Sequence, residues 1–207
     1  MSQNIAFMEK KLKAKDFINT GIFSVIFLVI FFISITVASM AVVTQPFGLA
    51  LCALIAGPVY MLLRAKTPKP GAILLFSVLF AVVMFATGTG WPMPVAILIG
   101  AAIAELMATI GKQQSFWLNG IGYGVLMVAS AIGSYTPLLM MKQYYLEVAS
   151  SNDVSGDFMA QLIEFISGPV LIAAFAATAV GAVLGVLLAR MMFEKHFIKA
   201  GLMKEVI

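Results

Sequence analysis

Histidine, cysteine and charged residues are scarce in this chain of 207 residues, which has one histidine, one cysteine and only 11% charged residues. A single cysteine excludes an internal disulfide bond. The sequence contains no Ser/His/Asp set, no HExxH motif and no phosphate-binding glycine loop, so we expect no enzymatic activity and no bound cofactor or metal. Because soluble domains carry about a quarter charged residues, the low charge also argues against a soluble fold.

Apolar residues take the place of the missing charge, and 62% of the chain is hydrophobic. A transmembrane helix needs about 20 largely apolar residues, and glycine, proline and charged residues separate six such stretches. The sequence therefore predicts an all-α integral membrane protein, a compact bundle of six transmembrane helices in a single membrane domain, residues 1–207. The expected spans are approximately residues 17–43, 47–63, 71–87, 95–110, 116–137 and 170–193. Residues 138–167 are expected to form an outer interfacial segment.

The expected spans place lysine and arginine almost entirely on one side of the membrane, in short loops and at both termini. The other side receives only Lys142, together with the acidic residues Glu147, Asp153, Asp157 and Glu164. Basic residues favour the cytoplasmic side, so both termini are predicted to be cytoplasmic. The net charge of +4 then reflects topology, and no nucleic-acid partner is expected.

Small residues recur at every fourth position of the last expected span, at Ala173, Ala177, Gly181, Gly185 and Ala189. Such a stripe lets another helix approach closely. Two interpretations are open. The stripe either packs inside the bundle or forms a docking face for a partner protein, with Gly181 and Gly185 at the contact.

Glu105 is the only acidic residue well inside an expected span, about two helical turns from Lys112. Carboxylates within membranes usually face the bundle interior or a cavity and often mark function. Asn119 and Tyr123 are expected at a similar depth and could hydrogen-bond to Glu105. A structural polar cluster, a coupling element and a proton relay are the three interpretations of this residue.

Polar and aromatic residues from three regions are expected to converge on the outer side of the membrane. The candidate substrate-binding residues are Gln45, Thr87, Thr89, Trp91, Tyr135, Met140 and Tyr144. Their character predicts a pocket for a flat, partly apolar compound rather than for a sugar or a bare ion. Aromatic side chains also gather at membrane interfaces for purely physical reasons, which is the alternative explanation for each of them.

Short motifs in order along nearly the whole chain carry a resemblance to a known family. They are Lys15–Ile18 with Gly21–Phe23, Gly57–Leu62, Lys69–Leu74, Ala104–Leu106, Gly133–Tyr135 and, most specifically, Lys195–Gly201. With these motifs the chain resembles a substrate-binding S component of an energy-coupling factor (ECF) transporter. More narrowly, it is similar to the Trep_Strep membrane family.

The resemblance implies a six-helix protein that captures a scarce nutrient at the outer face of the cell membrane. It implies association with a membrane T component and two cytoplasmic ATPases. Some relatives are linked to haem uptake, and haem iron bound here would need a tyrosine or methionine ligand. In S components a small-residue motif on the first span contacts the T component, and Thr20 and Ser24 have its spacing. A self-sufficient secondary transporter and a non-catalytic membrane assembly factor are the alternative functions.

Overall fold

A computed structural model describes residues 11–151 and 156–194 of the chain. The described residues form helices joined by short loops, without a strand among them. Asp153, His196 and the motif from Lys195 to Gly201 lie outside the described residues.

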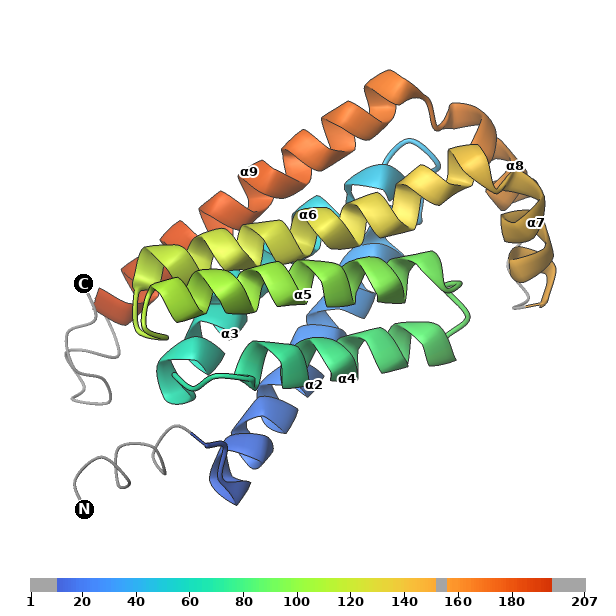
Figure 1. Cartoon of the computed structure of the whole chain (residues 1–207). Coiled ribbons are helices and arrows are strands. Elements are labelled where there is room, and N and C mark those ends of the chain that lie inside the picture. The colour runs from blue at the N-terminus through green and yellow to red at the C-terminus, as the bar shows by residue number, and fades with distance from the viewer. Residues whose placement is uncertain (1–10, 152–155, 195–207) are drawn as a thin grey trace, which may run out of the picture.

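Six helices run back and forth between two ends of an elongated bundle (Figure 1). They are α2 (Ala14–Ala38), α3 (Gly48–Lys66), α4 (Ala72–Ala86), α5 (Pro92–Ile110), α6 (Phe116–Met140) and α9 (Gly168–Met192). A short 3-10 helix, η1 (Gln45–Phe47), precedes α3. Between α6 and α9, the helices α7 (Lys142–Ser151) and α8 (Gly156–Phe165) form a cap beyond one end of the bundle.

Among the described residues, five segments are long and apolar enough to cross a membrane: α2, η1 with α3, α5, α6 and α9. The sixth helix, α4, is equally apolar but has only 15 residues, which give a length of about 22 Å. The expected count of six spans therefore stays a prediction, although α4 runs the same course between the ends as its neighbours.

The first expected span was placed too far toward the C-terminus. It was predicted over residues 17–43, whereas α2 ends at Ala38 and turns follow it. The apolar sequence continues beyond Ala38, but side-chain hydroxyl groups donate hydrogen bonds to the backbone carbonyls at the end of the helix. The Thr44 hydroxyl donates to the Ala38 carbonyl at 2.6 Å, and the Ser39 hydroxyl donates to the Ile35 carbonyl at 2.8 Å. Hydropathy alone does not detect such a stop.

Three other span boundaries differ by about one helical turn. The fourth span was predicted to begin at residue 95, but α5 begins at Pro92. The other two differ because helices extend past residues that ordinarily end them. The second span was predicted to end at Leu63, but α3 continues to Lys66, and its last turn carries Arg64 and Lys66, which suit a helix C-terminus. The fifth was predicted to end at Pro137, but α6 continues to Met140, with Pro137 inside the helix. The helical hydrogen-bond pattern continues after the proline, since the Met141 N–H donates to the Pro137 carbonyl at 2.7 Å.

Aromatic rings fill the core between α2, α3 and α4. Phe27 meets Phe76 and Phe80 edge to face, with ring centroids 4.9 Å and 5.2 Å away. Tyr60 and Tyr123 pack beside them with ring centroids 4.9 Å apart, and both are fully buried. Edge-to-face arrangements of this kind are preferred for aromatic pairs.

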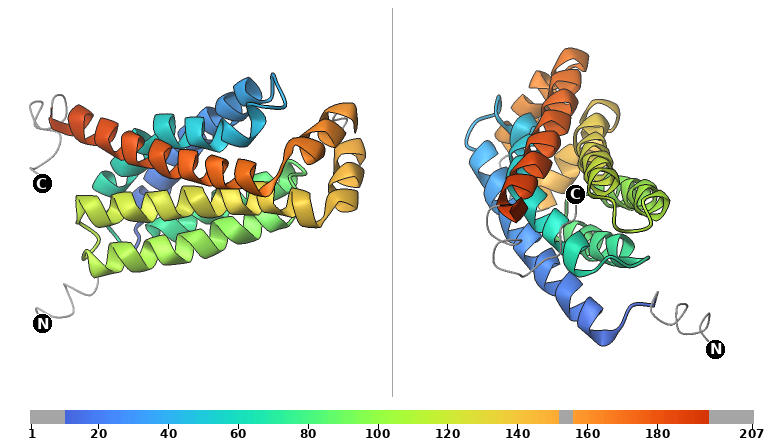
Figure 2. Two further views of the ribbon diagram at one scale, coloured as in Figure 1. Left: turned by 90° about the horizontal axis from the view of Figure 1, so that it is seen from above. Right: turned by 90° about the vertical axis from the view of Figure 1, so that its left-hand side faces the viewer.

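Backbone-to-backbone contact joins α3 and α9, which lie across one another in Figure 2. A Cβ atom on Gly185 would overlap the Ala53 carbonyl oxygen, and one on Gly181 would overlap that of Ala50. A Cβ atom on Gly57 would lie 2.5 Å from the carbonyl carbon of Gly185. Glycine is therefore required at these three positions of the crossing.

The two ends of the bundle carry opposite charge. We call the end formed by the C-terminal turns of α3 and α9 and the α5–α6 loop, with Arg64, Lys112 and Arg190, the basic end. The end with α7 and α8 carries the exposed acidic residues Glu147, Asp157 and Glu164, and we call it the acidic end.

Candidate functional site

The cap at the acidic end rests on the loop between α4 and α5. Gly90 in this loop is buried and has a φ of +85°, a conformation that favours glycine. A Cβ atom added to it would lie 3.2 Å from the Tyr144 hydroxyl and 3.4 Å from the Tyr145 hydroxyl. The absence of a side chain at Gly90 thus allows the tyrosine pair of α7 to lie directly over the loop.

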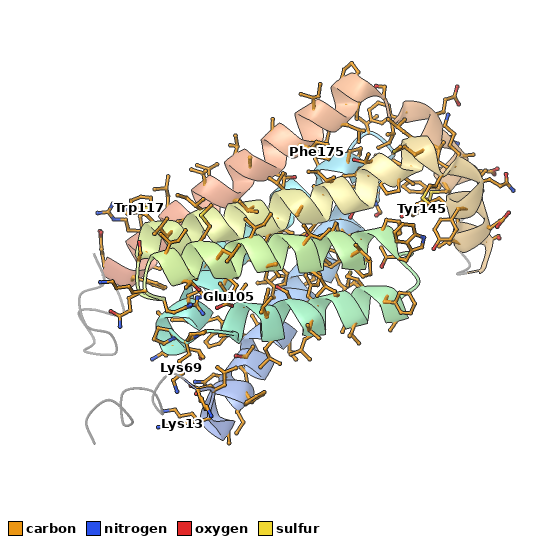
Figure 3. The ribbon with its side chains drawn as sticks, viewed as in Figure 1. Lys13, Lys69, Glu105, Trp117, Tyr145 and Phe175 are labelled. Atoms are coloured by element: carbon orange, nitrogen blue, oxygen red, sulfur yellow. The ribbon has the colours of Figure 1, made fainter. Side chains whose placement is uncertain are left out.

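The two tyrosines stand perpendicular to each other, with ring centroids 5.2 Å apart and an interplanar angle of 90°. The Tyr145 ring is buried, and its hydroxyl has no hydrogen-bond partner among the described residues. Burial raises the pKa of the Tyr145 phenol to about 12, so the group stays neutral and can donate a hydrogen bond. A buried hydroxyl without a partner is costly and therefore marks a position where a ligand group or water would bind favourably. Tyr145 lies at the cap in Figure 3.

A second contact at this end joins Tyr135 of α6 to the start of α3. The Tyr135 hydroxyl donates to the Gln45 backbone carbonyl at 3.0 Å, and its side chain is buried. The Gln45 side chain is half-buried, and its Oε1 accepts a hydrogen bond from Ser39 at 2.8 Å. Two of the residues predicted from sequence to share a site are thus in direct contact.

The other predicted binding residues face elsewhere. The Thr87 and Thr89 hydroxyls donate to the Met84 carbonyl at 3.0 Å and 2.6 Å, so both close the C-terminus of α4. Trp91 is 50% exposed and Met140 is 80% exposed. These four side chains therefore hold the loop or face outward, and the contacts at the acidic end centre on the tyrosines.

The small residues considered for partner docking lie inside the bundle. Gly181 and Gly185 pack against the backbone of α3, which occupies the space that a partner helix would need. Thr20 and Ser24 on α2 are also buried, and the Ser24 hydroxyl donates to the Thr20 carbonyl at 2.8 Å. Of the two interpretations of the last span, packing within the bundle accounts for its glycines.

A buried arginine organises the basic end. Arg64 is 2% exposed and donates from Nε to the Asn119 side-chain oxygen at 2.9 Å. It also donates to the Thr67 carbonyl at 3.1 Å and to the Gln113 side-chain oxygen at 2.5 Å. Arg64 therefore ties the C-terminus of α3 to both loops that follow α3 and α5.

Glu105 belongs to the same network without touching the arginine. Its Oε1 accepts from the Gly71 backbone N–H at 2.9 Å and from the Gln113 side-chain amide at 3.3 Å. Both expected partners were wrong, since Asn119 accepts a hydrogen bond from Arg64 and the Tyr123 hydroxyl donates to the Ala53 carbonyl at 2.8 Å. Glu105 is marked at the basic end in Figure 3. Of its three interpretations, these contacts favour the structural polar cluster.

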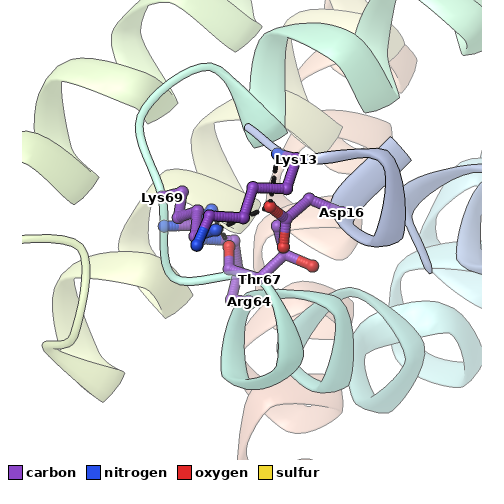
Figure 4. Close-up of polar contacts among 5 residues, drawn as sticks. All are labelled: Lys13, Asp16, Arg64, Thr67 and Lys69. Carbon is purple, nitrogen blue, oxygen red and sulfur yellow. Dashed lines mark hydrogen bonds and ion pairs between the residues drawn. The ribbon is translucent and has the colours of Figure 1, made fainter. Parts of the chain in front are cut away.

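An ion pair fastens α2 to this end (Figure 4). Lys69 Nζ lies 2.6 Å from Asp16 Oδ2, and the same oxygen accepts from the Lys13 backbone N–H at 2.7 Å. Asp16 at the first turn also suits the positive end of the helix dipole. This pair therefore joins α2 to the loop after α3, while Arg64 joins α3 to α6 and to the loop after α5.

Residues 14–199 match the family described as hypothetical bacterial integral membrane protein (Trep_Strep). The chain belongs to the Trep_Strep family. With five helices able to span a bilayer, this Trep_Strep protein is a multi-pass membrane protein. No curated protein matches the chain. No solved structure matches it either.

Sequence reasoning missed three residues that organise the two ends of this Trep_Strep protein: Arg64, Gln113 and Gly90. Arg64 was counted among the loop cations, because the second span was ended one residue before it. Gln113 has a positive φ of 66°, which is unusual for a residue other than glycine and has no sequence signal. For Gly90, the signal was its place in a Gly/Pro-rich turn, but the partner side chains are more than fifty residues away in sequence.

Proposed function

We propose that this chain is the substrate-binding S subunit of an ECF-type importer. In this role it captures a scarce nutrient at the acidic end and delivers it with a membrane T component and two ATPases. Membership of the Trep_Strep family supports the membrane setting. The main support for the proposal is the cap at the acidic end, where Tyr144 and Tyr145 lie over Gly90 and the buried Tyr145 hydroxyl has no hydrogen-bond partner among the described residues.

Six crossings with both termini in the cytoplasm are part of this proposal. Basic residues gather at the end where α2 begins and α9 ends, and this asymmetry is typical of the cytoplasmic side. The acidic end would then face outward and meet the nutrient first. Glu147 and Lys112 are exposed at opposite ends, and the native Cys52 is buried.

These positions allow a direct test of the orientation. Glu147→Cys should react with an impermeant thiol reagent in intact cells. Lys112→Cys, the matched control at the basic end, should react only after permeabilisation. The reverse pattern would overturn the orientation, and unmodified wild type would show that Cys52 does not contribute.

The proposed ligand is a flat, partly apolar molecule with at least one hydrogen-bond acceptor. Two perpendicular tyrosine rings offer stacking surface, and the neutral Tyr145 phenol offers a donor. Haem fits this description, with a tyrosine or methionine as the iron ligand. Opening and closing of α7 and α8 over the loop that contains Gly90 would admit and retain the ligand.

The subunit role is tested by affinity purification of the tagged chain from its own cells. We expect a membrane subunit and two ATPases in fixed ratio with the chain, by quantitative mass spectrometry. Purification of the chain alone, together with gradient-driven uptake into proteoliposomes without ATP, would instead identify a secondary transporter and reject the proposal.

The ligand site is tested separately on the purified chain, by mass spectrometry of retained small molecules and titration with haem. Tyr144→Ala should reduce retention by about tenfold, which is the scale of a buried aromatic contact. Phe85→Ala is the matched control, because Phe85 is an aromatic residue near the same end and is 65% exposed. Equal losses in both variants would place the ligand away from the cap.

A further inference from the structure

A lengthwise groove runs along the side of the bundle, and its lining includes none of the residues described at the cap. It has a volume of about 670 Å³, within the range of about 300–1,000 Å³ found for small-molecule sites. Eight of its lining residues come from α6, three from α5 and three from α9. Since α6 packs against both other helices, it forms the floor and they form the walls.

The lining of this groove is aliphatic apart from one indole. On α6 it reaches from Trp117 to Ile132, a distance of about 22 Å along the helix axis. That length exceeds the thickness of one leaflet of the hydrocarbon core, which is about 15 Å. An extended hydrocarbon chain matches both the shape and the chemistry of such a surface.

One end of the groove carries a cation. The Arg190 guanidinium stands over the Trp117 ring, 5.5 Å from its centroid, and the arginine side chain is 39% exposed. Its Nε also forms an ion pair with the Glu194 carboxylate at 2.9 Å; this pair uses one of the five N–H donors of the guanidinium, and the others are not part of it. Trp117 therefore belongs both to the apolar groove and to its charged mouth.

We propose that this groove binds one anionic phospholipid, with an acyl chain along α6 and the headgroup phosphate at Arg190. Arginine recognises phosphate through several parallel hydrogen bonds. Basic positions between transmembrane helices on the cytoplasmic side are typical sites for anionic headgroups. Tryptophan is favoured at headgroup depth, where its ring is apolar and its N–H is polar. A partner helix would fill the apolar groove equally well, but it would not require the cation at its mouth.

Gly124 offers a way to fill the groove without disturbing the bundle. It lies on the groove floor, and the nearest atom to an added Cβ is the Ala182 Cβ at 3.9 Å, an ordinary contact. Gly21 on α2 is the matched control, because an added Cβ there meets nothing within 4 Å and the groove does not include it. Ala179→Leu, on the wall formed by α9, provides a second filling variant.

The experiment is native mass spectrometry of the purified chain titrated with phosphatidylglycerol or phosphatidylcholine in detergent. We expect wild type and Gly21→Leu to bind phosphatidylglycerol preferentially as a single adduct. Gly124→Leu and Ala179→Leu should bind it about tenfold more weakly, because several methylene contacts are lost. Arg190→Gln should abolish the preference for phosphatidylglycerol while retaining weak binding of both lipids. A thermal melt confirms that each variant is folded.

Equal binding of phosphatidylglycerol by wild type and both groove-filling variants would overturn the proposal. So would an equal affinity of wild type for the two lipids. Loss of a copurifying membrane subunit from Gly124→Leu, with lipid binding unchanged, would assign the groove to a partner helix instead.

Discussion

At the basic end of the bundle a buried charged side chain holds the loops, whereas at the acidic end a glycine lies beneath two tyrosine rings. Arg64 makes hydrogen bonds to Asn119, Thr67 and Gln113, and Glu105 extends the same network to Gly71. The contacts described at Gly90 are those of van der Waals neighbours. Hydrogen bonds to a charged group have narrow geometric requirements, while ring surfaces tolerate sliding. The hydrogen bonds of Arg64 are therefore expected to restrict movement more than the packing of the two tyrosine rings on Gly90 does.

The largest effect on stability is expected when Arg64 is replaced. Arg64→Met keeps most of the side-chain volume but leaves the buried oxygens of Asn119 and Gln113 without their donor. We expect the free energy of unfolding to fall by about 3 kcal/mol. Chemical unfolding in detergent measures this effect. Lys66→Met is the control, because Lys66 is exposed on the same helix turn, and a similar loss there would contradict a special role for Arg64.

Gly90→Ala is expected to have a smaller effect on stability. A φ of +85° costs an alanine about 1–2 kcal/mol, and its Cβ would also press on the Tyr144 hydroxyl at 3.2 Å. We expect thermal stability to fall modestly and ligand retention to fall further, since the cap is lifted from the loop. Gly21→Ala should leave ligand retention unchanged and should not lower stability, because it adds a methyl group in open space on a helix, where alanine is favoured over glycine. Unaltered ligand retention in Gly90→Ala would separate the cap from the binding site.

The Asp16–Lys69 pair should contribute less than either of these. Its side chains are 10% and 21% exposed, and partly exposed pairs typically contribute about 0.5–1 kcal/mol. A double-mutant cycle with Asp16→Asn and Lys69→Met should give a coupling energy of that size, falling at high salt. A coupling energy near zero would mean that the Asp16–Lys69 pair does not contribute to the free energy of unfolding, which would leave Arg64 and its partners as the stabilising contacts of the basic end.

The smallest effect on stability is expected for Tyr145→Phe. The hydroxyl has no partner among the described residues, so its removal breaks no hydrogen bond. The change in unfolding free energy should stay within about 0.5 kcal/mol, while affinity for the retained ligand falls. A clear loss of stability, measured by the same unfolding experiment, would show that the hydroxyl has a structural role.

The sequence was sufficient to predict an all-helical membrane protein, because a bilayer leaves the backbone few alternatives to helices. It placed most helices within a few residues, since apolar runs and Gly/Pro breaks are local signals. It failed at Ala38, where threonine and serine hydroxyls end a helix inside an apolar run.

The candidate site was harder to predict than the helices. The tyrosines and the loop of Gly90 were placed on the same side, but whether a side chain points inward depends on helix rotation. Trp91 and Met140 were therefore included although they are exposed, and Tyr145 was not selected although it is buried. The contact between Arg64 and Asn119 joins positions 55 residues apart, and no local pattern indicates such a pairing.

The short length of α4 has a consequence for the surrounding bilayer. With 15 residues, it covers about 22 Å of a hydrocarbon layer that is about 30 Å thick. Where α4 crosses the membrane, as the proposed function requires, the lipids beside it would have to compress to match its length, and the membrane surface would be depressed there. The loop containing Gly90 directly follows α4 and would then lie below the surrounding headgroups. A partly apolar nutrient that dissolves in the interface could thus reach the tyrosines sideways, along the lipid surface, as well as from the aqueous phase.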